Sequence, residues 1–275
     1  MKRLNLLLLM LAVAFVSQVQ AVVYLDLDGN KVESSYTASN DFMEMYLADE
    51  PNGAAIMVYP GGAYAWKSMD YEGRYFAEFY NRYGISVFVV SYALPYGQCT
   101  VPLNSVERGM RGIKAHAEQY HIDPDRIGVM GSSAGGHLAS THATHFSVAT
   151  RPAFQVLLYP VITMDATLTH AESRANIIGQ TPSETDIALY SNELRVRENT
   201  PPAYIIVSQD DIVVPVENSI RYYKSLLDHN VPAELHVVPT GGHGWGSSET
   251  FAYHDMFYET LGIWLEKYVV AVPVE

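Results

Sequence analysis

The stretch GSSAG at residues 131–135 places two serines side by side between glycines. Only Ser133 occupies the centre of the pattern G-x-S-x-G, which sets a serine at the top of a tight turn from a strand into a helix. Glycine fits both flanking positions because a Cβ there would clash within the turn. An apolar run over Arg126–Met130 predicts the strand, and Ala134–Phe146 predicts the helix. This context favours an activated Ser133 over a plain glycine-rich turn, and it leaves Ser132 a packing or hydrogen-bonding role.

A reactive serine needs a base, and the base needs a carboxylate to orient it. Two carboxylates, Asp210 and Asp211, follow the apolar run Ala203–Val207, and His243 follows the run Ala233–Val238. Glycines flank His243 and suit a loop that reaches the serine. Serine, then acid, then histidine is the chain order expected for a nucleophile on this kind of turn. Chain order alone does not choose between the two aspartates.

A further segment could supply N–H groups to a developing negative charge. The sequence YPGGAY, residues 59–64, follows the apolar run Ala54–Tyr59. Its glycines allow backbone N–H groups to converge on one point. The N–H of Ala134, at the start of the expected helix, is a second donor, and the helix dipole there also favours negative charge. These donors predict an oxyanion hole.

The segments that must position these residues alternate between strand-like and helix-like patterns. Continuous apolar runs predict strands buried on both faces, and amphipathic stretches predict helices between them. This alternation predicts an α/β fold with a mostly parallel sheet covered by helices on both faces, where ligands collect at the carboxyl ends of the strands. The strands are expected at Val22–Leu27, Asp41–Leu47, Ala54–Tyr59, Ile85–Val90, Arg126–Met130, Phe154–Tyr159, Ala203–Val207 and Ala233–Val238, the first two as an edge hairpin, and the helices at Arg74–Tyr83, Asn104–Tyr120, Ala134–Phe146, Asn218–Asp228 and Thr250–Tyr268.

The N-terminal residues are not expected to belong to this fold. Lys2 and Arg3 precede an apolar run, Leu4–Val16, and a small-residue ending, Val19–Ala21. This pattern is typical of a cleaved signal peptide over residues 1–21 and predicts export to the periplasm or outside the cell, with an uncleaved anchor as the alternative. Residues 22–275 are then expected to form a single domain, with a small helical insertion at about residues 165–200.

Net charge limits the classes of binding partner, and the cysteine count limits the disulfides that the chain can form. The chain carries a net charge of −13, and loss of Lys2 and Arg3 would make it −15. Such a charge disfavours nucleic acid and anionic membrane surfaces as partners, and no membrane contact is expected beyond the signal segment. Cys99 is the only cysteine, so the chain cannot form an internal disulfide.

Four pieces of the chain, in order, resemble the α/β-hydrolase superfamily, and within it the acetylesterase and acetylxylan-esterase-like branch related to hormone-sensitive lipase. The pieces are Tyr59–Tyr64, Asp123–His137, Thr200–Asn218 and Gly242–Trp245, and the resemblance extends over residues 50–268. It implies Ser133 as nucleophile, His243 as base and an aspartate of the 210–211 pair as the orienting acid.

The same resemblance implies finer assignments. Asp211 fits the frame Asp-x-Val-Val-Pro and is the expected triad acid, whereas Asp210 falls one residue early and is expected to cap its own turn. The oxyanion donors are Gly62, Ala63 and Ala134. Ala63 departs from the lipase-like pattern, which has a third glycine there, so a positive φ at this position would strain an alanine.

Other residues give weaker signals. His142 and His145 stand three apart on an expected helix, but no carboxylate or cysteine completes a ligand set, so we expect no metal and no other cofactor. Tyr64, Trp66 and Trp245 adjoin the expected site in sequence and are candidates for substrate contact, with packing as an equal alternative.

The leading hypothesis is a secreted serine carboxylic-ester hydrolase that removes acetyl or other small acyl groups from saccharides through an acyl-enzyme. Its partner would be a small-molecule or oligosaccharide ester. One alternative is a serine peptidase of the prolyl-oligopeptidase type, which usually carries a large extra domain. A second is a non-catalytic binding protein on the same scaffold, which the intact serine, acid and histidine disfavour.

Overall fold

The computed structural model describes residues 22–33, 41–145 and 149–271. The expected signal segment, residues 1–21, lies outside the described residues. Within the described ranges, no helix is both long and apolar enough to cross a membrane.

The centre of the molecule is a sheet with the strand order β2-β1-β3-β5-β4-β6-β7-β8-β9 in the described residues. Its first part, from β2 to β5, pairs antiparallel, and β5-β4-β6-β7-β8-β9 pair parallel. The central parallel strands β5, β4, β6, β7 and β8 are buried on both faces, whereas the edge strand β9 is only partly buried. The strands are β1 (Val23–Leu25), β2 (Lys31–Val32), β3 (Phe42–Tyr46), β4 (Ala55–Tyr59), β5 (Ser86–Ser91), β6 (Ile127–Ser132), β7 (Gln155–Leu158), β8 (Ala203–Ser208) and β9 (Ala233–Val238).

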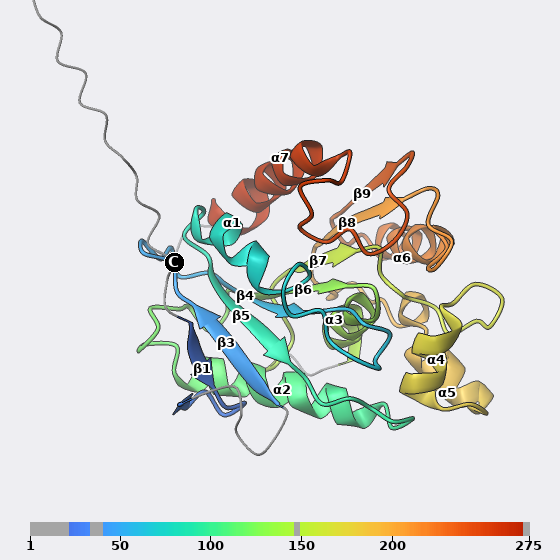
Figure 1. Ribbon diagram of the computed structural model, residues 1–275, viewed down its shortest axis with the longest axis horizontal. Coiled ribbons are helices and arrows are strands. Elements are labelled where there is room, and N and C mark those ends of the chain that lie inside the picture. Colours follow the sequence, from blue (N-terminus) through green and yellow to red (C-terminus); the bar gives the residue numbers. More distant parts are fainter. Residues whose placement is uncertain (1–21, 34–40, 146–148, 272–275) are drawn as a thin grey trace, which may run out of the picture.

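Helices cover both faces of this sheet, and each face has its own core (Figure 1). Alternate residues of a strand point to opposite faces, so Met57 packs in one core while its neighbours Ile56 and Val58 pack in the other. One face carries α2 (Thr100–Ala115), α3 (Ala134–His145) and α6 (Glu217–Asp228), and the other carries the 3₁₀ turn η1 (Arg74–Phe76), α1 (Ala77–Asn81), α7 (His254–Leu265) and the π-helical turn η3 (Glu266–Val270).

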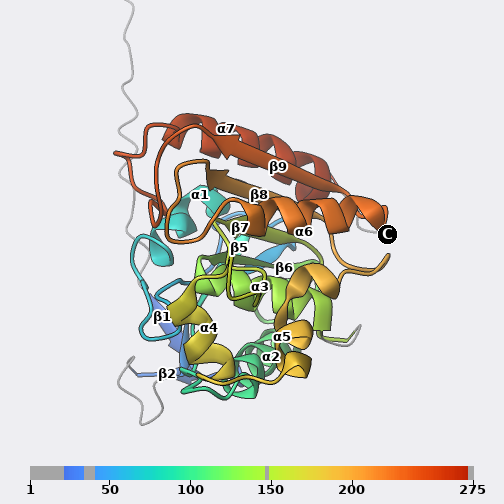
Figure 2. The ribbon, with the colours of Figure 1, turned by 90° about the vertical axis from the view of Figure 1, so that its right-hand side faces the viewer.

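Between β7 and β8 the chain forms a helical insertion, as the sequence predicts. It consists of α4 (Ala171–Ile178), α5 (Glu184–Tyr190) and the 3₁₀ turn η2 (Asn192–Leu194). Figure 2 shows α4 and α5 lying in front of α2 and α3. The side-chain amide of Asn192 donates to the carbonyl of His137 at 3.1 Å and to Ser140 Oγ at 2.7 Å, which ties the insertion to α3.

The α/β fold is confirmed, and the differences from the sequence prediction are local. The two-residue strand β2 is too short to produce a periodic signal. The expected helix over Arg74–Tyr83 divides into η1 and the short α1, and the last helix starts at His254 rather than Thr250. Boundaries such as these depend on capping and packing that a hydrophobic pattern does not encode.

Candidate active site

The turn between β6 and α3 holds Ser133 in a left-handed backbone conformation, with φ of 54°. This conformation strains a residue with a side chain, and the surroundings maintain it. The N–H of Ser133 donates to the carbonyl of Leu158 at 3.0 Å, and its carbonyl accepts from the N–H of Val161 at 3.0 Å. A Cβ at Gly131 would collide with the carbonyl of Gly135. The glycines around Ser133 therefore permit the turn to close.

A chain of hydrogen bonds connects Ser133 with His243 and Asp211. His243 Nε2 lies 2.8 Å from Ser133 Oγ, and His243 Nδ1 lies 2.7 Å from Asp211 Oδ2. The Asp211 side chain is fully buried, whereas 15% of the His243 side chain is exposed. The other carboxylate oxygen of Asp211 accepts the N–H groups of Val213 and Val214 at 2.9 and 2.8 Å. A carboxylate fixed in this way holds the proton on Nδ1, so Nε2 is free to accept the serine proton.

The neighbouring Asp210 does not contact His243 through its side chain. Its Oδ1 accepts the N–H of Gly242 at 2.8 Å, although we expected it to cap its own turn. The physical reason is the pairing of β8 with β9, which sets the loops after these two strands side by side. Asp210 therefore fastens the histidine loop, while Asp211 orients the histidine itself.

The YPGGAY loop lies against the nucleophile. A Cβ at Gly61 would come within 3.0 Å of Ser133 Cβ. Within the part of the chain that the structure describes, no hydrogen-bond acceptor faces the backbone N–H groups of Gly62, Ala63 or Ala134. Unpaired N–H groups in the loop against the nucleophile and at the start of α3 are suited to stabilise an oxyanion, and their assignment as the donors stays a prediction.

Ala63 has a positive φ, the conformation that strains an alanine at this position. Its φ is 54°, and that of Tyr64 is 58°. A left-handed conformation costs a residue with a Cβ roughly 1–2 kcal/mol. The side-chain amide of Asn176 on α4 donates to the Ala63 carbonyl at 2.8 Å. The helical insertion is therefore hydrogen-bonded to the YPGGAY loop at the peptide group between Ala63 and Tyr64.

A buried carboxylate lies beneath the same loop. Glu72 Oε2 accepts the N–H of Gly61 at 3.0 Å, and Glu72 Oε1 accepts the hydroxyl of Tyr159 at 2.6 Å. The Tyr159 oxygen in turn accepts the N–H of Gly246 at 2.8 Å, and its ring lies edge-on to the His243 ring with centroids 4.8 Å apart. Burial raises the pKa of Glu72, while the hydrogen bond from Tyr159 and the charge of His243 oppose that rise. This network joins the oxyanion loop to the histidine loop.

Sequence reasoning did not find Glu72, Tyr159 or Asn176. Tyr159 had a weak signal, since it ends a predicted strand at the carboxyl edge of the sheet, where site residues gather. Glu72 and Asn176 lie in segments without a motif, and only the folded chain brings them to the loop.

The three aromatic candidates for substrate contact lie in different environments. Tyr64 is 2% exposed, its hydroxyl bonds His137 Nδ1 at 2.9 Å, and its ring packs against Tyr92. The expectation of substrate contact is therefore corrected for Tyr64, because its side chain is enclosed in the core. Trp245 is 6% exposed, and its ring is stacked on that of Phe251, so it packs mainly against other side chains. Trp66 is 55% exposed, and its contact with substrate stays a prediction.

The histidines of α3 are bonded within the protein. His142 Nδ1 lies 2.8 Å from the Tyr59 hydroxyl and Nε2 lies 2.9 Å from the Thr150 carbonyl, and burial lowers the pKa of His142 to about 3. His145 Nε2 lies 2.7 Å from the Leu189 carbonyl. Among the described residues, no three His, Cys, Asp or Glu side chains gather in a group that could hold a metal ion.

Comparison with known proteins agrees with this geometry. A family model for the alpha/beta hydrolase fold matches residues 56–247, and the chain belongs to this family. The chain is 40% identical over 228 residues to an acetylxylan esterase of Xylanibacter ruminicola. The aligned region covers 82% of this chain and 48% of that protein. The chain is 34% identical over 232 residues to endo-1,4-beta-xylanase B of Butyrivibrio fibrisolvens, with 77% and 36% covered. The chain thus spans less than half the length of these two relatives.

A solved structure matches over nearly its whole length. An acetyl ester-xyloside bifunctional hydrolase from Caldicellulosiruptor lactoaceticus is 32% identical and superposes with a TM-score of 0.81, covering 89% of this chain and 95% of that one. The resemblance to the α/β-hydrolase superfamily is confirmed by the family match and by this structure.

Proposed function

We propose that this protein is a serine carboxylic-ester hydrolase that removes acetyl or other small acyl groups from saccharides. The observation that carries the proposal is the hydrogen-bonded chain from Ser133 Oγ through His243 to the buried Asp211. The unpaired N–H groups of Gly62, Ala63 and Ala134 support it as oxyanion donors. Nucleophile, base, orienting acid and oxyanion donors are the four parts that acyl transfer needs.

The mechanism follows from these positions. His243 Nε2 takes the proton of Ser133 Oγ as that oxygen attacks the ester carbonyl. The N–H groups of Gly62, Ala63 and Ala134 hold the negative charge of the tetrahedral intermediate, and losing one such donor typically costs about 3–4 kcal/mol. The intermediate then collapses, and His243 gives its proton to the departing alcohol.

The acyl group is now attached to Ser133 Oγ. A water molecule attacks the acyl carbonyl while His243 Nε2 takes a proton from it. The second tetrahedral intermediate expels the serine oxygen, which recovers its proton from His243. The products are the free alcohol and a carboxylic acid, and the enzyme returns to its starting state.

The relatives support a saccharide ester as substrate. Two of the similar proteins are described as an acetylxylan esterase and an acetyl ester-xyloside hydrolase. We therefore propose acetylated xylo-saccharides as the substrate class. The basic start, apolar run and small-residue ending of residues 1–21 support export, which would bring the enzyme to polysaccharide outside the cytoplasm.

The test compares substrates of different chemistry. The purified protein should hydrolyse p-nitrophenyl acetate and release acetate from acetylated xylo-oligosaccharides, with product masses lower by one acetyl group per cleavage. A fluorophosphonate should label the wild type and leave Ser133→Ala unlabelled. Hydrolysis of a peptide anilide without release of acetate would instead support the peptidase alternative. Absence of both activities and of labelling would support a binding protein.

A further inference from the structure

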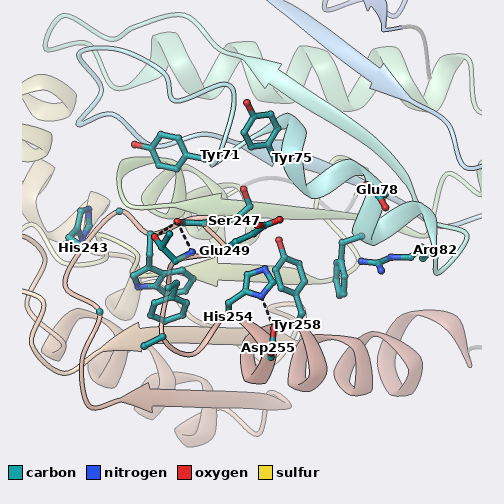
Figure 3. A pocket seen from close by; sticks show the side chains of 18 residues that line it. Tyr71, Tyr75, Glu78, Arg82, His243, Ser247, Glu249, His254, Asp255 and Tyr258 are labelled. Atoms are coloured by element: carbon teal, nitrogen blue, oxygen red, sulfur yellow. Dashed lines mark hydrogen bonds and ion pairs between the residues drawn. The ribbon is translucent and has the colours of Figure 1, made fainter. Parts of the chain in front are cut away.

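A groove lined in part by the loop of His243 lies outside the hydrogen-bonded chain of Ser133, His243 and Asp211. Its volume is about 1270 Å³, and its lining includes His243. Figure 3 shows it extending from His243 between the segment of Tyr71, Tyr75 and Arg82 on one side and the segment of His254 and Tyr258 on the other. The first segment leads through η1 into α1, and the second is the start of α7.

The lining combines aromatic rings with polar groups. Tyr71 and Tyr75 are 37% and 61% exposed, so their rings are accessible from the groove. Tyr258 packs against Phe79 and His254 on the floor. Charged side chains, among them Glu78, Arg82 and Glu249, also line the groove. Amphipathic rings beside charged hydrogen-bonding groups suit a ligand with apolar C–H faces and many hydroxyls, which is the chemistry of a saccharide.

An aliphatic chain fits this lining poorly. A fatty acyl group in the groove would remove water from the charged side chains and would offer them no hydrogen bond in return. Such unpaired burial costs free energy. The volume is also above the roughly 300–1000 Å³ that is typical of a site for a single drug-sized ligand. The groove therefore has room for several sugar rings.

The place of the groove relative to His243 decides which part of an ester it would hold. Proton transfer from Nε2 to the leaving oxygen requires that oxygen to lie within hydrogen-bond reach of the imidazole. The alcohol half of the ester must then lie on the histidine side of Ser133. The groove is lined by the loop of His243 and not by Ser133 or the oxyanion loop, so it lies on the side of the alcohol half rather than the acyl half.

We propose that this groove binds the saccharide chain beyond the acylated sugar, so that the enzyme acts on oligosaccharides in preference to an acylated monosaccharide. The inference rests on the proposed esterase function and deepens it. Tyr75 provides the sharpest test because it is the more exposed of the two rings and takes no part in the triad or the oxyanion loop.

Kinetics on substrates of different length form the first experiment. Tyr75→Ala should lower kcat/KM for acetylated xylohexaose roughly 5- to 10-fold through KM, as loss of one ring contact implies. It should leave kcat/KM for p-nitrophenyl acetate unchanged, because that ester is too small to reach the ring. Tyr75→Phe should behave like the wild type. Ile263→Ala, an exposed apolar side chain of α7 outside the groove, is the control.

Direct binding separates failure of this inference from failure of the proposed function. Titration calorimetry of unacetylated xylohexaose into Ser133→Ala should show binding, and the added Tyr75→Ala change should weaken it by the same factor. Binding without hydrolysis by the wild type would reject the esterase but support the groove. If the wild type hydrolyses acetates but Tyr75→Ala does not change kcat/KM for acetylated xylohexaose, the saccharide-binding role of the groove is overturned and the esterase function stands. A loss confined to p-nitrophenyl octanoate would assign the groove to the acyl chain and overturn the inference.

Discussion

The carboxylate of Glu72 accepts a 2.6 Å hydrogen bond from the hydroxyl of Tyr159, whose ring lies edge-on to the ring of His243. The other oxygen of Glu72 accepts the N–H of Gly61 in the oxyanion loop. One buried side chain thus connects the two loops whose relative position determines whether the base and the oxyanion donors meet at the same carbonyl.

Replacement of Glu72 should separate the role of its hydrogen bonds from that of its charge. Glu72→Ala leaves the N–H of Gly61 and the hydroxyl of Tyr159 buried without an acceptor, at about 1–3 kcal/mol each. We expect lower thermal stability and a lower kcat on p-nitrophenyl acetate. Glu72→Gln keeps one of the two acceptor oxygens, so it should lose less thermal stability and less kcat than Glu72→Ala does. Equal damage in the two variants would contradict the hydrogen-bonding role.

Comparison of the wild type with Glu72→Gln also gives a prediction about the pH dependence of stability. Burial raises the pKa of Glu72 in the folded protein, so the folded state binds its proton more tightly than the unfolded chain. Stability should fall as pH rises from the ordinary carboxyl range through the raised pKa, because the charged form is disfavoured by burial. Glu72→Gln lacks this loss, so its Tm relative to wild type should increase between pH 4 and pH 8. A constant difference in Tm would contradict the prediction.

The two serines of the turn should respond differently to truncation. Ser133→Ala removes the nucleophile and should abolish turnover of p-nitrophenyl acetate. Ser132 is fully buried near Tyr159, and within the described residues its hydroxyl makes no hydrogen bond of good geometry. Ser132→Ala should therefore keep most of the activity and cost little stability. The check is kcat for each variant together with its Tm, and a matching loss in both variants at unchanged Tm would undermine the assignment of Ser133.

The two aspartates offer a similar contrast. Asp211→Asn should lower kcat by about 10⁴, because an amide at this position favours the wrong histidine tautomer. Asp210→Asn keeps an oxygen that can accept the N–H of Gly242, so its effect should be mild. The measurement is the ratio of kcat for Asp211→Asn to kcat for Asp210→Asn, with circular dichroism as a control for folding. If Asp210→Asn proves more damaging, the role of Asp211 has been misassigned.

Asn176 tests whether the helical insertion takes part in positioning the oxyanion loop. Asn176→Ala removes the hydrogen bond to the Ala63 carbonyl and should lower kcat roughly 5- to 10-fold, as loss of about 1 kcal/mol predicts. KM should change little, because the donors act most strongly in the transition state. Glu172→Ala, an exposed change on the same helix, is the control. An effect on KM alone would assign Asn176 to substrate binding instead.

Much of the fold could be predicted from the sequence because the central parallel strands are buried on both faces and are mostly apolar. The turn at Ser133 could be predicted because its geometry requires glycines at fixed positions. Glu72 and Tyr159 are 87 residues apart, and Ala63 and Asn176 are 113 apart. Such pairings depend on which loops the finished sheet brings together, and no local pattern records them. Tyr64 shows the converse, since proximity in sequence to the site did not place its ring there.

The strand order has a consequence for how activity is gained during folding. Ser133 and His243 are separated by 110 residues and reach each other only through the parallel pairing of β6, β7, β8 and β9. Long-range parallel contacts form slowly because loop closure must precede them. Helices such as α2 and α6 form from local contacts and should appear earlier. During refolding from denaturant, esterase activity should therefore return later than the far-ultraviolet signal of the helices, making the active site a reporter of the completed sheet.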